Sequence, residues 1–132
     1  MPPDVKNLIE DTENYIRQRF EKNRHHVACG LVTESDTYFS LHLDTSGYDI
    51  CAEPIALSNA LQAGDRDFKM LVATYWNGDE SVNPTIVTPC GDCRQMLVEY
   101  APNLSVIIDT GNGIELTQIT DLLPYPYVSP GR

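Results

Sequence analysis

The sequence predicts an α/β fold, namely a three-layer α/β/α sandwich around a mixed sheet of about five strands. Helix-like and strand-like segments alternate along the 132 residues, and strands joined by helices favour helices on both faces of such a sheet. The composition, 42% hydrophobic and 21% charged, is ordinary for a globular protein with a real core. The chain shows no repeat or linker, and its length suits one domain. We therefore expect a single domain over residues 1–132.

The N-terminal part is expected to form a helix followed by a β-hairpin. Between residues 5 and 23, apolar residues recur at spacings of three and four, which predicts an amphipathic helix covering the sheet. Residues 26–32 and 37–43 are strand-like, and the polar residues 33–36 between them are turn-like. These segments predict two antiparallel strands.

The rest of the chain alternates between helix and strand. The expected elements are, in order, a helix at 51–63, a strand at 68–76, a polar loop at 77–84, a helix at 90–100, a strand at 104–109 and a short strand or helix at 114–123. Gly64 and Pro102 mark the ends of the two helices, because glycine favours the position after a helix and proline cannot continue one.

The charge of the chain argues against a nucleic-acid partner. The net charge is −10, with only nine Lys plus Arg residues and no basic cluster, whereas affinity for nucleic acid comes largely from basic side chains. We expect a small neutral or cationic ligand instead. The chain contains no apolar run of about 18 residues and no signal-like start, so we expect no membrane partner and a cytoplasmic protein. Its four cysteines then indicate metal binding or catalysis.

Two short segments have the residues of a zinc site: 51–53 (Cys-Ala-Glu) and 89–93 (Pro-Cys-Gly-Asp-Cys). Each opens a predicted helix, and Pro54 supports the first start because proline suits the first helical turn. The partial positive charge of a helix N-terminus stabilises thiolate, the form that binds metal. Cys90 and Cys93 have the spacing of a zinc-ligand pair. We predict one Zn²⁺ per subunit, held by Cys51, Cys90 and Cys93.

Glu53 gives this predicted site a catalytic character. Three protein ligands leave one tetrahedral position for water, which ionises near neutral pH. Glu53 follows Cys51 by two residues, so its carboxylate is placed to take the proton of the water and pass it to a leaving group. A ligand-x-Glu followed by Pro-Cys-x-x-Cys is the zinc-deaminase signature in its three-cysteine form. Glu53 is therefore the predicted catalytic residue.

From about Val27 to Leu123 the chain resembles the cytidine deaminase family in its short homotetrameric branch, most strongly at residues 88–95. The resemblance implies hydrolytic replacement of the exocyclic amine of a cytosine-type ring by oxygen, with release of ammonia. It implies that Glu53 protonates the ring nitrogen and that Arg94 compensates the charge of the thiolates. It also implies a homotetramer. Further substrate-binding residues that it implies are Ala52, Thr88, Pro89 and, reaching a neighbouring subunit, Tyr127.

Departures from the family pattern bear on the substrate. Pro54 stands where many members have Arg, and the loop 45–50 is short, as in the blasticidin-S deaminase branch of the family. Cytidine-specific members have Asn-x-Glu where this chain has His42 and Asp44. By resemblance, we expect His42 and Asp44 to contact the sugar side of a small-molecule substrate, which is cytidine, deoxycytidine or a blasticidin-S-like cytosine nucleoside.

Three alternatives remain open at this point. Another aminated heterocycle would suit the same chemistry. Cys29 lies in the middle of a predicted strand and is expected in the core. If it were instead a fourth zinc ligand, the protein would be a non-catalytic four-cysteine zinc-binding protein. Glu53 would then be an acidic residue that only stabilises the start of its helix. A nucleic-acid editor would share the signature, although the net charge of −10 argues against it.

Overall fold

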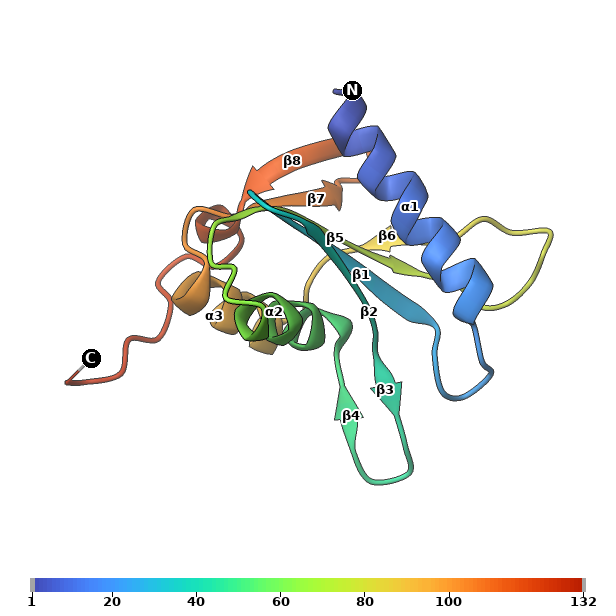
Figure 1. Cartoon of the computed structure of the whole chain (residues 1–132), viewed down its shortest axis with the longest axis horizontal. Helices are drawn as coiled ribbons and strands as arrows, with labels where there is room; N and C mark the ends of the chain where they lie inside the picture. The colour runs from blue at the N-terminus through green and yellow to red at the C-terminus, as the bar shows by residue number, and fades with distance from the viewer. Residues whose placement is uncertain (1, 132) are drawn as a thin grey trace.

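The computed structural model describes residues 2–131, which form three layers around a mixed sheet (Figure 1). The predicted sandwich is confirmed, with α1 on one face of the sheet and α2 and α3 on the other (Figure 1). The elements are α1 (Pro3–Arg19), β1 (Val27–Thr33), β2 (Thr37–Leu41), β3 (Leu43–Asp44), β4 (Asp49–Ile50), α2 (Ala52–Gln62), β5 (Phe68–Tyr75), β6 (Thr85–Val87), α3 (Gly91–Tyr100), β7 (Ser105–Asp109), β8 (Ile114–Gln118) and the 3₁₀ helix η1 (Ile119–Leu122).

Strand β5 is the centre of the main sheet. The strand order is β2-β1-β5-β7-β8, and β6 also pairs with β5, which gives six strands. On the side away from β1, two strands pair with β5, each along half of its length. Its first half pairs with β7, with Met70 opposite Ser105 in parallel orientation, and its second half pairs with β6, with Ala73 opposite Val87 in antiparallel orientation. The sheet is therefore mixed, as predicted.

The core has two sides because side chains alternate along β5. Met70 and Val72 pack under α1, in contact with the cluster that includes Val5 and Leu8. Leu71, between them, faces α2 and α3. On α2, residues 52, 56 and 60 are fully buried alanines, spaced four apart on one helix face. Small side chains let a helix approach the sheet closely, so the start of α2 is held firmly against β1 and β2.

The structure differs from the sequence-based expectation in its short elements. The first helix ends at Arg19 rather than near residue 23, and Asn23 in the following turn has a left-handed backbone with φ of 64°. The predicted strand at 37–43 is divided into β2 and the short β3. Strands β4 and β6 were not expected, because two or three residues are too few to show an alternating pattern. The segment 114–123 is a strand followed by η1. Every helix in residues 2–131 is too short or too polar to cross a membrane.

Candidate active site

The site is built on the first turns of α2 and α3. Cys51 is the N-cap of α2 and Cys90 is the N-cap of α3, and both have an extended backbone. The two helix starts meet, because the Sγ atoms of Cys51 and Cys90 are 3.9 Å apart. Unpaired backbone N–H groups and the partial positive charge of both helices therefore converge on the same point.

Three sulfur atoms at this point fit a zinc ion. The Sγ atoms of Cys51, Cys90 and Cys93 all lie within 4.8 Å of one another. Thiolates bound tetrahedrally to zinc at about 2.3 Å lie about 3.8 Å apart, close to the 3.9 Å between Cys51 and Cys90. Cys51 and Cys90 are exposed and Cys93 is buried, so the cluster is open on one side. The sequence prediction that these three residues come together is confirmed.

The electrostatics of the three thiols also call for a cation. Burial raises the pKa of the Cys51 thiol, and burial together with the charge of Glu53 raises the pKa of the Cys93 thiol. Burial acts in the same direction on Cys90, but a hydrogen bond from the Cys93 backbone N–H leaves the pKa of the Cys90 thiol lower than usual. Three adjacent thiolates repel one another, and a divalent metal ion removes that repulsion. The donor set therefore fits Zn²⁺.

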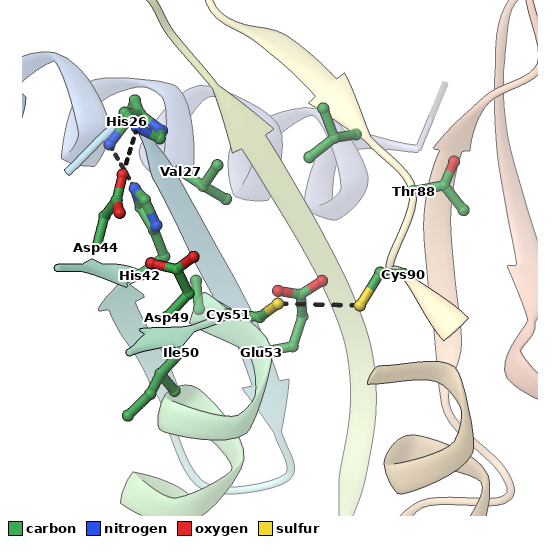
Figure 2. Close-up of a pocket in the computed structure, with 12 residues that line it drawn as sticks. His26, Val27, His42, Asp44, Asp49, Ile50, Cys51, Glu53, Thr88 and Cys90 are labelled. Atoms are coloured by element: carbon green, nitrogen blue, oxygen red, sulfur yellow. Dashed lines mark hydrogen bonds and ion pairs between the residues drawn. The ribbon is translucent and has the colours of Figure 1, made fainter. Parts of the chain in front are cut away.

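Glu53 lies beside the sulfur cluster, on the first turn of α2 (Figure 2). Only 5% of the residue is exposed. Burial raises the pKa of the Glu53 carboxyl above its ordinary value, which suits a group that must accept and release a proton. The turn is held by Ser40 on β2, whose hydroxyl donates to the Ala52 carbonyl at 2.6 Å. Sequence reasoning missed Ser40, because a single serine in a strand carries no motif.

A cavity of about 290 Å³ opens onto the cluster (Figure 2). It is lined by His26, Val27, His42, Asp44, Asp49, Ile50, Cys51, Ala52, Glu53, Val87, Thr88 and Cys90. Four of the substrate-binding residues expected from sequence are therefore at the cavity, namely residues 42, 44, 52 and 88. Pro89 is fully buried and does not line the cavity, and Tyr127 lines a separate surface pocket beside Val98.

One side of the cavity is polar. The His26 backbone N–H donates to Nε2 of His42 at 2.9 Å, and His26 Nε2 lies 3.5 Å from an Asp44 oxygen. Burial and the neighbouring His26 lower the pKa of His42. Asp44 faces Asp49 across the β3–β4 pair and raises the pKa of Asp49. Sequence reasoning missed Asp49, which the pairing of the two-residue strands β3 and β4 places at the cavity. It also missed His26, which directly precedes β1 and reaches the cavity through its backbone contacts with Trp76 and His42.

The sequence could not determine the partners of Arg94 or whether Cys29 belongs to the metal cluster. Nε of Arg94 donates to the Pro89 carbonyl at 2.8 Å and Nη1 donates to the Leu122 carbonyl at 2.9 Å, so these two bonds go to the backbone rather than to sulfur. Cys29 is fully buried in the core beneath α2. Within the described residues, the sulfur cluster that suits a metal includes only the other three cysteines. This arrangement argues against Cys29 as a fourth ligand.

Comparison with known proteins agrees with the site. Residues 5–108 match the family model for the cytidine and deoxycytidylate deaminase zinc-binding region. The chain is 32% identical over 125 residues to blasticidin-S deaminase of Bacillus cereus, covering 91% of this chain and 89% of that protein. It is 31% identical over 127 residues to cytidine deaminase of Sporosarcina psychrophila, covering 92% and 89%.

Solved structures support the fold. The crystal structure of the cytidine deaminase from Bacillus anthracis matches with a TM-score of 0.77 at 20% identity, covering 92% of this chain and 88% of that one. Fold and site together define a zinc-dependent deaminase. The chain belongs to the cytidine and deoxycytidylate deaminase family.

Proposed function

We propose that this protein hydrolyses the exocyclic amine of a cytosine-bearing nucleoside or nucleoside-like compound, releasing ammonia. The observation that carries the proposal is the buried Glu53 carboxyl beside three clustered sulfur atoms at an open cavity. The similar proteins include a cytidine deaminase and a blasticidin-S deaminase, and both names indicate a substrate with a cytosine ring.

Each residue of the cluster has a proposed role. Cys51, Cys90 and Cys93 hold the zinc ion, which when bound supplies a Lewis acid able to ionise water near neutral pH. The Glu53 carboxylate accepts a proton from the attacking water. It delivers that proton to the ring nitrogen beside the amine-bearing carbon. It then accepts the proton of the hydroxyl group now on that carbon and passes it to the amine, which leaves as ammonia while the C=O bond forms. Burial supports this role, since it raises the pKa of Glu53 and separates the carboxyl from bulk water.

The remaining cavity residues are proposed to orient the substrate. The backbone of Ala52 and Thr88 borders the ring, and His42 and Asp44 contact the sugar side. Since Nε2 of His42 accepts the His26 N–H, the neutral ring keeps its proton on Nδ1 and can donate to a substrate hydroxyl. Arg94 adds a positive charge one residue after Cys93. Three thiolates and Zn²⁺ sum to −1, so a nearby cation preserves the acidity of the metal.

At the level of the molecule, we propose one domain over residues 1–132 that assembles as a homotetramer in the cytoplasm. The last segment runs away from the body (Figure 1), with Tyr125 fully exposed and Tyr127 68% exposed. Tyr125, Tyr127 and Val128 are all exposed within four residues, and neighbouring exposed apolar side chains are typical of a protein–protein contact. We propose that Tyr127 reaches the cavity of a neighbouring subunit. Light scattering coupled to size-exclusion chromatography tests the assembly, and a monomeric mass would contradict it.

The decisive experiment compares substrates and two matched variants. Zinc-loaded protein is mixed with cytidine, deoxycytidine, cytosine or blasticidin S, and ultraviolet absorbance and ammonia are followed. Glu53→Gln is expected to lower kcat by about 10²- to 10⁴-fold while keeping one zinc per chain. Glu115→Gln, an exposed change on β8, is the control and should leave kcat unchanged. A zinc-loaded wild-type protein that is silent on all four compounds would contradict the proposed substrate class.

A further inference from the structure

The guanidinium of Arg94 joins two segments that are distant in sequence. Its Nε atom donates to the Pro89 carbonyl at 2.8 Å, and its Nη1 atom donates to the Leu122 carbonyl at 2.9 Å. The side chain is half-buried, so both bonds are partly shielded from water. A guanidinium is planar and rigid, so a group that donates to two carbonyls fixes their relative positions as well as binding each one.

The first carbonyl belongs to the segment that presents Cys90. Residues 88–90, here called the metal loop, connect β6 to α3, and Thr88 and Cys90 both line the cavity. Pro89 between them is fully buried and has no N–H, so its carbonyl is its only hydrogen-bonding group. Arg94 holds that carbonyl, and with it the backbone position of Cys90.

The second carbonyl belongs to the end of the chain. Leu122 closes η1, whose first residue, Ile119, is anchored by a hydrogen bond from its N–H to the Leu104 carbonyl at 2.9 Å. The neighbouring Gln95 adds another contact, because its Nε2 donates to the Tyr127 carbonyl at 2.8 Å. The first turn of α3 thus holds the C-terminal segment, residues 119–128, at two points, and one of these is the same guanidinium that holds the metal loop.

We propose that Arg94 is a positioning residue that couples the metal loop to the C-terminal segment, so that zinc binding and order in that segment stabilise each other. The proposal rests on the proposed function in one respect, namely that Cys90 and Cys93 bind zinc. Coupling of this kind is reciprocal: if order in the segment strengthens zinc binding, zinc must order the segment by the same factor. The role goes beyond charge, because it depends on the forked geometry of the guanidinium.

The substitution Arg94→Lys separates geometry from charge. An ammonium keeps the positive charge near the cluster but is a single point on a flexible stem, and it cannot hold two carbonyls in the fixed geometry of a guanidinium. If Arg94 acts only through charge, Arg94→Lys retains the properties of the wild type. If Arg94 acts as a coupling residue, Arg94→Lys loses them.

The test measures hydrogen exchange of residues 119–128 and zinc affinity by competition with a chromophoric chelator, on the full chain. In the wild type, zinc should slow exchange in this segment by about fivefold or more. Arg94→Lys should abolish that zinc dependence and weaken zinc affinity by about 10- to 100-fold. Gln95→Ala is the matched control on the same helical turn. It should speed exchange at Tyr127 and Val128 but leave both the exchange of residues 119–123 and the zinc affinity within about twofold, because it leaves both Arg94 contacts intact.

Two outcomes would overturn the coupling. One is an Arg94→Lys variant with the zinc affinity and the exchange pattern of the wild type. The other is a wild-type segment whose exchange is the same with and without zinc, a comparison that needs no variant and so stands even if Arg94→Lys folds poorly. A wild-type protein that binds no zinc would instead refute the proposed metal ligands, and this result is distinguishable from both.

Discussion

Ser40 supports the catalytic turn although it does not contact the cavity. Its buried hydroxyl donates to the Ala52 carbonyl at 2.6 Å, one residue before Glu53. Ser40→Ala leaves that carbonyl without this partner inside the protein, which should cost about 1 kcal/mol of unfolding free energy. Because the turn that carries Glu53 loosens as well, we expect kcat to fall while KM changes little. Urea unfolding and steady-state kinetics of the zinc-loaded protein measure the two effects.

Ser58 provides the matched control for Ser40. It lies exposed on α2 and its hydroxyl receives only a 3.4 Å contact from Gln62. Ser58→Ala should change the unfolding free energy by less than about 0.5 kcal/mol and leave kcat unchanged. Equal effects of the two substitutions would show that the buried Ser40 contact does not position the turn.

His42 should make stability depend on pH. Burial and the nearby His26 lower the pKa of His42, and its Nε2 can accept the His26 N–H only while the ring is neutral. Below about pH 6.5, the ordinary pKa of histidine, the unfolded chain takes up a proton that the folded chain resists. The unfolding free energy therefore falls as pH decreases through this range.

His42→Gln removes the titrating group and keeps an acceptor. Its urea midpoint should vary less between about pH 7 and pH 5 than that of the wild type. Both proteins are measured after treatment with chelator, because protons also displace zinc from thiolates. Parallel pH curves would exclude His42 as the source of the dependence.

Sequence spacing predicts some residues of the site, whereas tertiary contacts bring the others to it. Cys51, Glu53, Cys90 and Cys93 could be predicted because their spacing within two helical turns already determines which groups converge. Residues brought in by tertiary contacts could not. His26 depends on strand pairing, and the partners of Arg94 depend on where the chain returns after β8.

Among the elements, α1 lies so close to β1 that one added methyl group between them should destabilise the protein. A Cβ atom added at Gly30 would meet Thr12 Oγ1, and would lie 2.9 Å from Leu8 Cδ1 and 3.3 Å from Phe39 Cε1. The Thr12 hydroxyl is itself held by the Leu8 carbonyl at 2.7 Å. Gly30→Ala should therefore lower the unfolding free energy by about 1–3 kcal/mol, as overpacking does. Urea denaturation measures the change.

Gly47 is the control for this contact. It lies in the turn between β3 and β4, where an added Cβ would meet nothing within 4 Å. Gly47→Ala should alter the unfolding free energy by less than about 0.5 kcal/mol. If both variants unfold at the same urea concentration as the wild type, the packing of α1 on β1 is looser than the structure indicates.

Element lengths explain which parts of the fold could be predicted. α1 buries residues 5, 8, 12 and 16, a spacing that appears directly in the sequence as helical periodicity. The long β5 is an apolar run between polar segments and was also recognisable. The pairing of β3 with β4 extends over two residues on each strand, and β6 over three, so their formation depends on the neighbours they find.

For the molecule as a whole, we expect the fold to survive removal of zinc. The core between the sheet and the helices contains Leu57, Leu71, Leu97 and Val106, all buried away from the metal cluster, and it does not need a metal to form. A free zinc concentration of 100 times the dissociation constant should add about 2.7 kcal/mol to the unfolding free energy, because zinc binds the folded state alone. The chelated protein should therefore melt cooperatively, but at a lower temperature, in calorimetry.

Two cysteine variants check which thiols give that increment. Cys51→Ala should lose the zinc-dependent rise in melting temperature. Cys29→Ala, which truncates a core residue, should melt lower than the wild type but keep the same rise on adding zinc. Loss of the rise in Cys29→Ala would restore the four-cysteine site as an explanation.

The division of one edge of β5 between β6 and β7 has a consequence for how the protein is made. As the chain leaves the ribosome from its N-terminus, β1, β2 and β5 can pair first, but the first half of β5 keeps an open edge until residues 105–109 emerge. Because the pairing of β5 with β7 is parallel and spans more than thirty residues, it closes late. Until then, the unpaired backbone edge at Met70 and Leu71 is open to pairing with a strand of another nascent chain, and a chaperone that covers this edge would prevent such association.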